Sequence, residues 1–257
     1  MRNDPASTRL RSALGALPRR LGPYGAMWAT LLVGGALVVA LAAVAAEVYE
    51  SVVEADGVAG VDKPLLAWMV GLRTPELSSG ITAFTDIGGT IGMPVLAVLV
   101  IAVLSRISRS WRPLILIGTA ALGSLAMTIV GKNVIGRSRP DLADAVPPYE
   151  TSPSFPSGHT LNATAIVAVI AYLCCLEIDS TVGRVAVILA SALFVVLMGL
   201  SRVFLGHHWF TDVAAAWALG LAWAAVVVLA HRVFRTVRDV RRARARAASH
   251  GGPGHLR

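Results

Sequence analysis

The chain has 257 residues, of which 55% are hydrophobic and only 15% are charged, and its mean hydropathy is +0.67. This composition excludes a soluble globular protein and predicts a protein of the membrane. The formal net charge of +8 does not indicate a nucleic-acid partner, because nearly all of the basic residues are arginines beside long apolar runs. Cys174 and Cys175 are adjacent inside an apolar run, so the sequence contains neither a disulfide framework nor a CxxC metal motif.

Six apolar stretches approach the length that a spanning helix needs, which is about 20 residues. They cover residues 28–46, 87–105, 113–131, 159–176, 185–201 and 213–230. The sequence therefore predicts an all-α fold, an integral-membrane bundle of six transmembrane helices. Residues 61–72 are apolar but too short to cross, and they predict a helix lying at the membrane interface within the first loop between spans.

The arginines indicate how the spans are oriented, because cytoplasmic loops carry the excess of basic residues. The two ends of the chain and the loops after the second and fourth spans hold 17 of the 23 basic residues, so both termini are expected in the cytoplasm. We expect a basic tail over residues 1–25, a membrane domain over 26–231 and a basic, disordered tail over 232–257 that contacts anionic lipid. A signal peptide is the alternative for the first run, but the run is longer than the apolar core of about 7 to 15 residues that such peptides have.

The polar residues most unusual for this composition all adjoin the ends of the last four predicted spans. They are Lys132, Arg137, Arg139, Ser157, His159, Ser201, Arg202, His207, His208 and Asp212. Because consecutive spans run antiparallel, these ends share one side of the bilayer, which the arginine count assigns to the extracytoplasmic surface. Cations there oppose the positive-inside tendency and are costly near hydrocarbon, so a function is expected to compensate.

These residues suit the binding of phosphate. Lys132, Arg139 and Arg202 supply donors for a group with several anionic oxygens, and guanidinium groups match phosphate geometry. Ser157 and Gly158 lead into the start of the fourth predicted helix, where free backbone N–H groups favour an anion.

The histidines suit the chemistry. His208 and Asp212 are four residues apart on the sixth predicted helix, so the carboxylate can hold one imidazole N–H and leave the other nitrogen as a nucleophile or base. His159 comes from a different helix and can protonate a leaving oxygen.

The motifs Lys132-(six residues)-Arg139-Pro140, Pro156-Ser157-Gly158-His159 and Ser201-Arg202-(five residues)-His208-(three residues)-Asp212 resemble, in order and spacing, the three-part signature of the type 2 phosphatidic acid phosphatase superfamily. The resemblance covers residues 113–230. It implies a six-helix membrane enzyme that hydrolyses lipid phosphate through a phosphohistidine and needs no metal or other cofactor. It implies His208 as nucleophile, Asp212 as its partner, His159 as general acid, and phosphate binding by Lys132, Arg139 and Arg202 with Ser157 and Gly158.

Other interpretations stay open at several positions. A zinc site on His159, His208 and Asp212 is the main rival, although three nearby cations would repel a divalent metal. His207 is expected to be a surface or supporting residue, and Arg137 a solvated charge or an outer donor to the site.

The substrate is expected to be a lipid phosphate or diphosphate, with undecaprenyl diphosphate favoured for an outward-facing site. Phosphatidate and phosphatidylglycerophosphate are the alternatives, and selectivity is expected in the proline-rich loop over residues 141–157. A non-enzymatic transporter or scaffold that binds phospholipid headgroups is the second class of function. The sequence does not indicate an oligomeric state.

Overall fold

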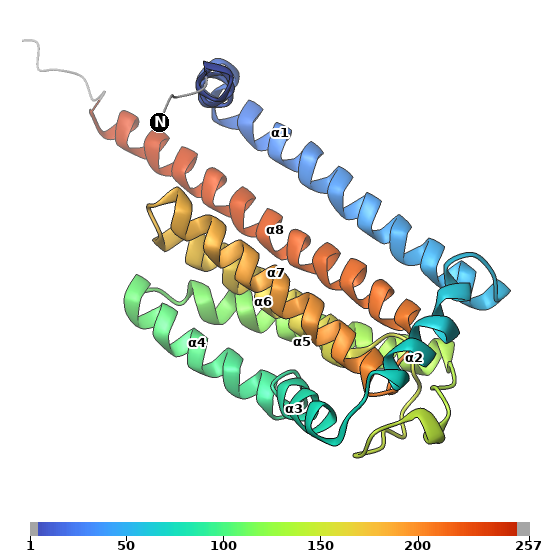
Figure 1. The fold of residues 1–257 in the computed structure, drawn as a ribbon. Helices are drawn as coiled ribbons and strands as arrows, with labels where there is room; N and C mark the ends of the chain where they lie inside the picture. The colour runs from blue at the N-terminus through green and yellow to red at the C-terminus, as the bar shows by residue number, and fades with distance from the viewer. Residues whose placement is uncertain (1–4, 251–257) are drawn as a thin grey trace, which may run out of the picture. The chain divides into compact units, whose positions relative to one another are not determined.

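The computed structural model describes the backbone of residues 5–250, with side chains for 24, 25, 27–243, 245 and 246. Every regular element in this range is helical, which confirms the predicted all-α fold (Figure 1). In chain order the elements are α1 (Pro5–Glu54), η1 (Gly57–Val61), α2 (Asp62–Gly71), α3 (Pro75–Asp86), α4 (Gly92–Ser108), α5 (Arg112–Ile135), η2 (Leu142–Asp144), α6 (Gly158–Glu177), α7 (Thr181–Phe204) and α8 (Phe210–His250).

Within the described residues, five helical segments are long and apolar enough to cross a membrane. They are Met27–Glu54, Arg112–Ile135, Gly158–Glu177, Thr181–Phe204 and Phe210–Ala243. These segments contain the whole of the first, third, fourth, fifth and sixth predicted spans and extend beyond them at both ends. The chain is therefore a multi-pass membrane protein.

The second predicted span differs from the structure. The helix α4 starts at Gly92 rather than at residue 87 and has 17 residues, which is about 26 Å at 1.5 Å per residue, against a hydrocarbon core of about 30 Å. Residues 87–91 form a tight turn instead, in which a Cβ added at Gly92 would lie 2.2 Å from the carbonyl oxygen of Asp86. The count of six spans stays a prediction.

The first loop contains more helix than the sequence analysis predicted. The expected helix over residues 61–72 is α2, and its location at a membrane interface stays a prediction. The helix α3 was not expected, although its start carries clear signals: Thr74 caps it by accepting the Leu77 N–H at 3.2 Å, and Pro75 follows at the first helical position. It was missed because a search for charge-free runs passes over a short amphipathic helix.

The last helix extends beyond the predicted sixth span. The tail from residue 232 was expected to be disordered, whereas α8 continues to His250. Alanine and arginine, which dominate this stretch, are both strong helix formers. Residues 1–4 and 251–257, the outer ends of the two expected tails, lie outside the described residues, and the division at residues 25 and 231 stays a prediction.

The chain forms two compact units, Met1–Ala36 with Leu229–Arg257, and Leu37–Val228. In the first unit, Gly34 faces Leu229, whose Cδ1 would lie 3.0 Å from an added Cβ. The second unit contains every candidate site residue. Its core is built around α6, which packs against both α5 and α7 and is buried over much of its length.

The helix α8 joins this core through a close approach to α6. A Cβ added at Gly220 would lie 2.7 Å from Cβ of Thr164, so only glycine allows the two backbones to come so near. Ala224 and Val227 of α8 extend the same buried cluster.

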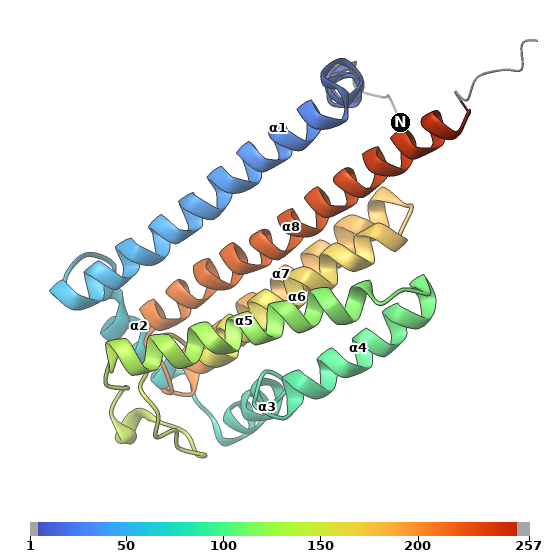
Figure 2. The same cartoon turned by 180° about the vertical axis from the view of Figure 1, so that it is seen from behind.

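Four helix ends of the second unit meet at one end of the bundle. The end of α5, the start of α6, the end of α7 and the start of α8 lie together there, beside α2 and the long loop after α5 (Figures 1 and 2). Backbone hydrogen bonds tie them: the Ser157 N–H donates to the Asp212 carbonyl at 3.3 Å, and the Val146 N–H donates to the Leu205 carbonyl at 2.9 Å. The predicted gathering of the polar clusters on one side of the bundle is therefore what the fold produces.

Candidate functional site

His208 is presented by a tight turn between α7 and α8. Gly206 has φ +70°, and an added Cβ would lie 2.0 Å from the carbonyl oxygen of Asp144, so this position requires glycine. The N–H groups of His207 and His208 then donate to the carbonyl of Arg202 at 3.0 and 3.3 Å. The turn directs His208 into the protein, where it is almost completely buried.

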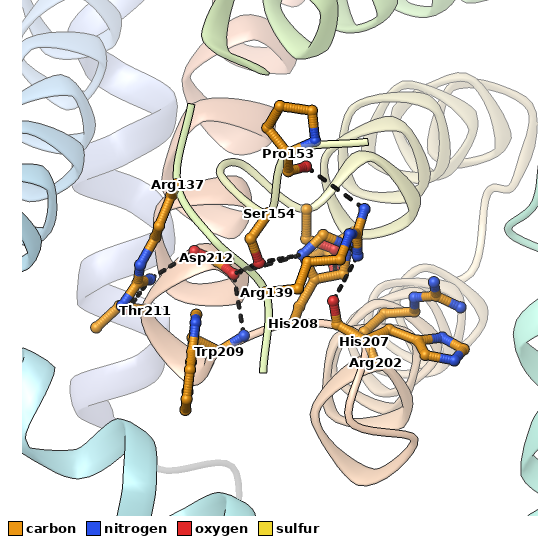
Figure 3. Close-up of polar contacts among 12 residues, drawn as sticks. Arg137, Arg139, Pro153, Ser154, Arg202, His207, His208, Trp209, Thr211 and Asp212 are labelled. Atoms are coloured by element: carbon orange, nitrogen blue, oxygen red, sulfur yellow. Dashed lines mark hydrogen bonds and ion pairs between the residues drawn. The ribbon is translucent and has the colours of Figure 1, made fainter. Parts of the chain in front are cut away.

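The predicted pairing of His208 with Asp212 is present, but the local structure differs from the expectation. His208 lies two residues before α8 begins, not on the helix itself. Its Nδ1 is 3.4 Å from Oδ2 of Asp212. Its Nε2 is 3.2 Å from Nη1 of Arg139, so the free nitrogen of the ring faces the cations (Figure 3).

The Asp212 carboxylate is held by donors from three directions. Trp209 N–H donates to Oδ2 at 2.9 Å, the Ser154 hydroxyl donates to the same oxygen, and Arg137 Nη1 donates to Oδ1 at 2.6 Å (Figure 3). Asp212 is fully buried, and each of these bonds favours its ionised form. Arg137 is therefore an outer donor to the site, the second of its two expected roles.

A further carboxylate supports this arrangement from α2. Asp62 accepts from Arg137 Nη2 at 2.8 Å, from the Thr211 N–H at 2.9 Å and from the Thr211 hydroxyl at 2.6 Å. It is buried, although it lies in the loop region between the first two predicted spans. Sequence reasoning missed both Asp62 and Ser154, and neither carries a motif that would have identified it.

The three predicted phosphate-binding cations all lie near enough for their charges to act on His208. Arg139 and Arg202 both contact the carboxylate of Glu150: Arg202 Nη2 is 2.5 Å from Oε1, and Arg139 Nη2 is 3.2 Å from Oε2. Lys132, in the last turn of α5, donates to the Ser152 hydroxyl at 3.0 Å and to the Pro153 carbonyl. We call Lys132, Arg139 and Arg202 the cation cradle.

The predicted residues at the start of α6 are placed differently from one another. Ser157 is buried, and its hydroxyl pairs with that of Thr160 at 3.0 Å. His159, in the first turn, has no hydrogen-bond partner among the described residues, and its Nε2 would lie 3.5 Å from a Cβ on Gly89. Gly158 packs close to α5, since an added Cβ would lie 3.0 Å from Cγ2 of Thr128.

The charges of the site act on its ionisable groups. Burial and the charges of Arg139, Arg202 and Lys132 hold the pKa of His208 well below its usual value, so the imidazole is neutral at neutral pH. Burial favours the neutral acid at Glu150, but Arg202 and Arg139 outweigh it and lower the pKa of that carboxyl to about 2. The resting site thus contains a neutral His208 imidazole and an ionised carboxylate on the cradle.

A cavity of about 450 Å³ adjoins the cradle. Arg139, Glu150, Ser152 and His207 line it together with Arg137 and the proline-rich loop. Within the described residues, no three His, Cys, Asp or Glu side chains are grouped so that they could hold a metal ion. The charged groups in contact with this pair are Arg139 at His208 and Arg137 at Asp212.

Comparison with known proteins relates this chain to a family of phosphatases. A family model described as the PAP2 superfamily matches residues 112–235. The chain is 31% identical over 170 residues to phosphatidylglycerophosphatase B of Bacillus subtilis, covering 66% of this chain and 82% of that protein. It is 31% identical over 139 residues to decaprenylphosphoryl-5-phosphoribose phosphatase of Mycobacterium tuberculosis, covering 53% and 70%.

Two solved structures share the fold. The crystal structure of the first transmembrane PAP2 type phosphatidylglycerolphosphate phosphatase, from Bacillus subtilis, has a TM-score of 0.65 and 29% identity, covering 76% of this chain and 93% of that one. Aquifex aeolicus LpxE has a TM-score of 0.52 and 20% identity, covering 65% and 94%, and supports the fold alone.

Proposed function

This chain belongs to the PAP2 superfamily, and on that premise we propose that it hydrolyses a lipid phosphate through a phosphohistidine formed on His208. It is a phosphate ester hydrolase, as its named relatives are. The observation that carries the proposed mechanism is the orientation of one ring. His208 Nδ1 faces Asp212 while Nε2 faces Arg139, which places the reactive nitrogen toward the site where an oxyanion would bind.

The first step transfers the phosphoryl group to the enzyme. The Nε2 lone pair attacks phosphorus in line, the N–P bond forms, and the bond from phosphorus to the lipid oxygen breaks. His159 donates a proton to that departing oxygen. Asp212 fixes the ring and stabilises the positive charge that the imidazole acquires.

The second step releases phosphate. Water attacks phosphorus, His159 takes its proton, and the N–P bond breaks so that the electron pair returns to Nε2. Throughout both steps the cation cradle holds the equatorial oxygens, whose charge it stabilises most in the transition state. Arg202 suits this role because it is buried and its Nε has no partner among the described residues, leaving a donor for a tetrahedral oxyanion.

The site is proposed to face the extracytoplasmic side of the inner membrane, with both termini in the cytoplasm. The support is the distribution of the arginines, which are concentrated in the loops and ends away from the catalytic end of the bundle. The lipid tails would reach the site laterally between helices.

The substrate is proposed to be a lipid that carries a phosphate monoester. The names of the two curated relatives denote phosphatidylglycerophosphate and decaprenylphosphoryl-5-phosphoribose, which favours this class over the expected undecaprenyl diphosphate. Turnover of undecaprenyl diphosphate, phosphatidate and phosphatidylglycerophosphate in matched detergent would rank them directly.

The test of the mechanism is His208→Ala in the purified full-length protein. Release of inorganic phosphate should fall by about 10⁴-fold or more, since a covalent step is lost. His231→Gln, a histidine change 19 residues beyond Asp212 along α8, is the matched control. A chelator should leave activity intact. Activity that survives His208→Ala, or that disappears with the chelator, would contradict the histidine mechanism. Transport of phospholipid headgroups that survives His208→Ala would favour a transporter.

A further inference from the structure

The cation cradle is already occupied by the protein's own acidic side chain. Glu150 lies in the loop between η2 and α6 and belongs to none of the three motif segments. Its two carboxylate oxygens divide between two arginines, Oε1 to Arg202 and Oε2 to Arg139. A carboxylate in this bridging position resembles two of the oxygens of a bound phosphate.

The neighbouring loop residues complete the same arrangement. Arg139 Nε donates to the Ser152 carbonyl at 2.6 Å, and Lys132 Nζ donates to the Ser152 hydroxyl and the Pro153 carbonyl. All three cradle cations therefore donate to residues 150–153 of one loop. A phosphate can take their place only if these bonds are exchanged.

The loop residues 150–153 do not provide an acceptor for every donor of the cation cradle. Arg202 is only 2% exposed, and its Nε has no hydrogen-bond partner among the described residues while Nη2 contacts Glu150. A buried donor without a partner is costly, and a planar carboxylate leaves this one unsatisfied. The cradle therefore has more donors than its resident acceptors use, as expected of a site built for a larger oxyanion.

We propose that Glu150 is an internal competitor, which occupies the phosphate site at rest and must be displaced before any phosphate headgroup can bind. This inference rests on the proposed function, because it concerns the same site. An oxyanion can therefore occupy the cation cradle only if its affinity for the cradle is high enough to displace Glu150. Weakly bound oxyanions fail to open the site, whereas a substrate with a terminal phosphate succeeds.

The charges of the competing groups explain why such a threshold separates headgroups. Ordinary membrane phospholipids are phosphodiesters with one negative charge on phosphorus, the same charge that Glu150 already supplies. A terminal phosphate carries a charge close to −2 above its second pKa of about 6. Because the Coulomb attraction to the cradle scales with that charge, the dianion gains more on replacing the carboxylate than the diester does.

The competitor remains charged over the whole range in which the substrate titrates. With a pKa of about 2, Glu150 is ionised wherever a phosphate monoester changes from monoanion to dianion. Being tethered to the loop, it competes at an effective concentration in the millimolar range, independent of the lipid content of the membrane.

The structure also provides space for the displaced side chain. Glu150 is 29% exposed, in contrast to Arg202, and it lines the cavity of about 450 Å³ beside the cradle. The carboxylate can turn toward that cavity while the arginines stay in position. The same return movement would help to expel the phosphate product.

The test is the sign of the change in affinity for inorganic phosphate when the competitor loses its charge. Full-length protein in detergent is titrated calorimetrically at pH 8 with inorganic phosphate and, separately, with dimethyl phosphate, a monoanionic diester. If the site is open in about one molecule in ten, Glu150→Gln should tighten binding of each ligand about tenfold. Asp141→Asn removes an exposed carboxylate at the start of the proline-rich loop that forms no ion pair among the described residues, and it should leave both affinities unchanged.

The opposite sign would overturn the proposal. If Glu150 only supports the cations, Glu150→Gln should weaken phosphate binding, and unchanged affinity would equally exclude a competitor. A gain for inorganic phosphate without a gain for dimethyl phosphate would overturn the screening of phosphodiester headgroups. Glu150→Asp, whose shorter side chain cannot bridge both arginines, provides a second variant with the same expected sign should the glutamine variant not fold.

Failure of the proposed function would be distinguishable from failure of this inference. The binding measurement needs no turnover, so its sign is informative even if the wild-type protein hydrolyses no lipid phosphate. Conversely, normal hydrolysis together with weaker phosphate binding by Glu150→Gln would contradict this inference alone.

Discussion

The two halves of the site differ in where their polar groups find partners. The His208–Asp212 half is held by Arg137, Ser154 and the Trp209 N–H, and Arg137 is held in turn by Asp62 of α2. The cation cradle, by contrast, donates mainly to residues 150–153 of a single loop. The proposed nucleophile is therefore fixed from several elements, whereas the proposed phosphate site is filled by one loop segment.

This difference follows from what each half must do. A nucleophile gains most from an orientation that exists before substrate arrives, because no reorganisation is then needed during the reaction. A phosphate site cannot leave three cations buried without acceptors, since unpaired buried charge is strongly unfavourable. Temporary acceptors from a loop stabilise the empty site and still allow exchange.

The largest effect that separates the halves is expected for Asp212→Asn. The change should lower kcat for phosphate release by about 10³-fold, because a neutral amide cannot stabilise the imidazole charge and can hold the ring in the wrong tautomer. The affinity for inorganic phosphate should stay within about twofold of the wild-type value. An equal loss of both would show that the two halves do not act separately.

A smaller effect is expected for Arg137, whose side chain contacts Asp212. Arg137→Gln removes the charged donor shared by Asp212 and Asp62, and a hydrogen bond of this kind contributes about 1.5 to 3 kcal/mol, or at least tenfold in kcat. KM should change little, since the Arg137 side chain bonds to Asp62, Thr211 and Asp212 and not to the loop residues 150–153 that fill the cradle. Arg137→Lys should restore only part of kcat, because an ammonium cannot serve both carboxylates with a planar fork. A rise in KM with unchanged kcat would count against a positioning role.

The smallest effect concerns stability in mild acid. Burial, assisted by Arg202, lowers the pKa of His207 to about 4 from an ordinary 6.5, so between these values the unfolded chain binds a proton that the folded chain does not. The free energy of unfolding should therefore fall as the pH drops from 6.5 toward 4. His207→Gln should flatten this fall between pH 6.5 and 5, a window above the titration of ordinary carboxyl groups. Thermal unfolding in detergent measures it, and identical slopes for both proteins would refute the assignment.

The sequence was most informative where a physical requirement of the membrane produces a pattern of residues that can be recognised directly. Runs of about 20 apolar residues are obligatory for spanning helices, so five long spans could be predicted by counting. Lys132, Arg202 and His208 were conspicuous for the same reason, since cations and imidazoles beside hydrocarbon are costly without a function.

The rest depended on the path of loops, which no periodicity encodes. Ser154 and Glu150 are single polar residues in the long loop before α6, and Asp62 is a single carboxylate at the start of α2. Each gains its meaning only from a partner far away in the chain. The start of α4 at Gly92 was missed because residues 87–91 carry no charge, although their Gly-Gly pair is typical of the turn that they form.

The most direct measurement of the central claim is to trap the phosphorylated enzyme. Purified protein is mixed with a lipid phosphate carrying labelled phosphorus, quenched within one turnover under alkaline conditions that preserve phosphohistidine, and mapped by mass spectrometry. We predict label on His208 that is lost on acid treatment and absent from His208→Ala. Complete turnover with no labelled protein at any quench time, or label on another residue, would contradict the account.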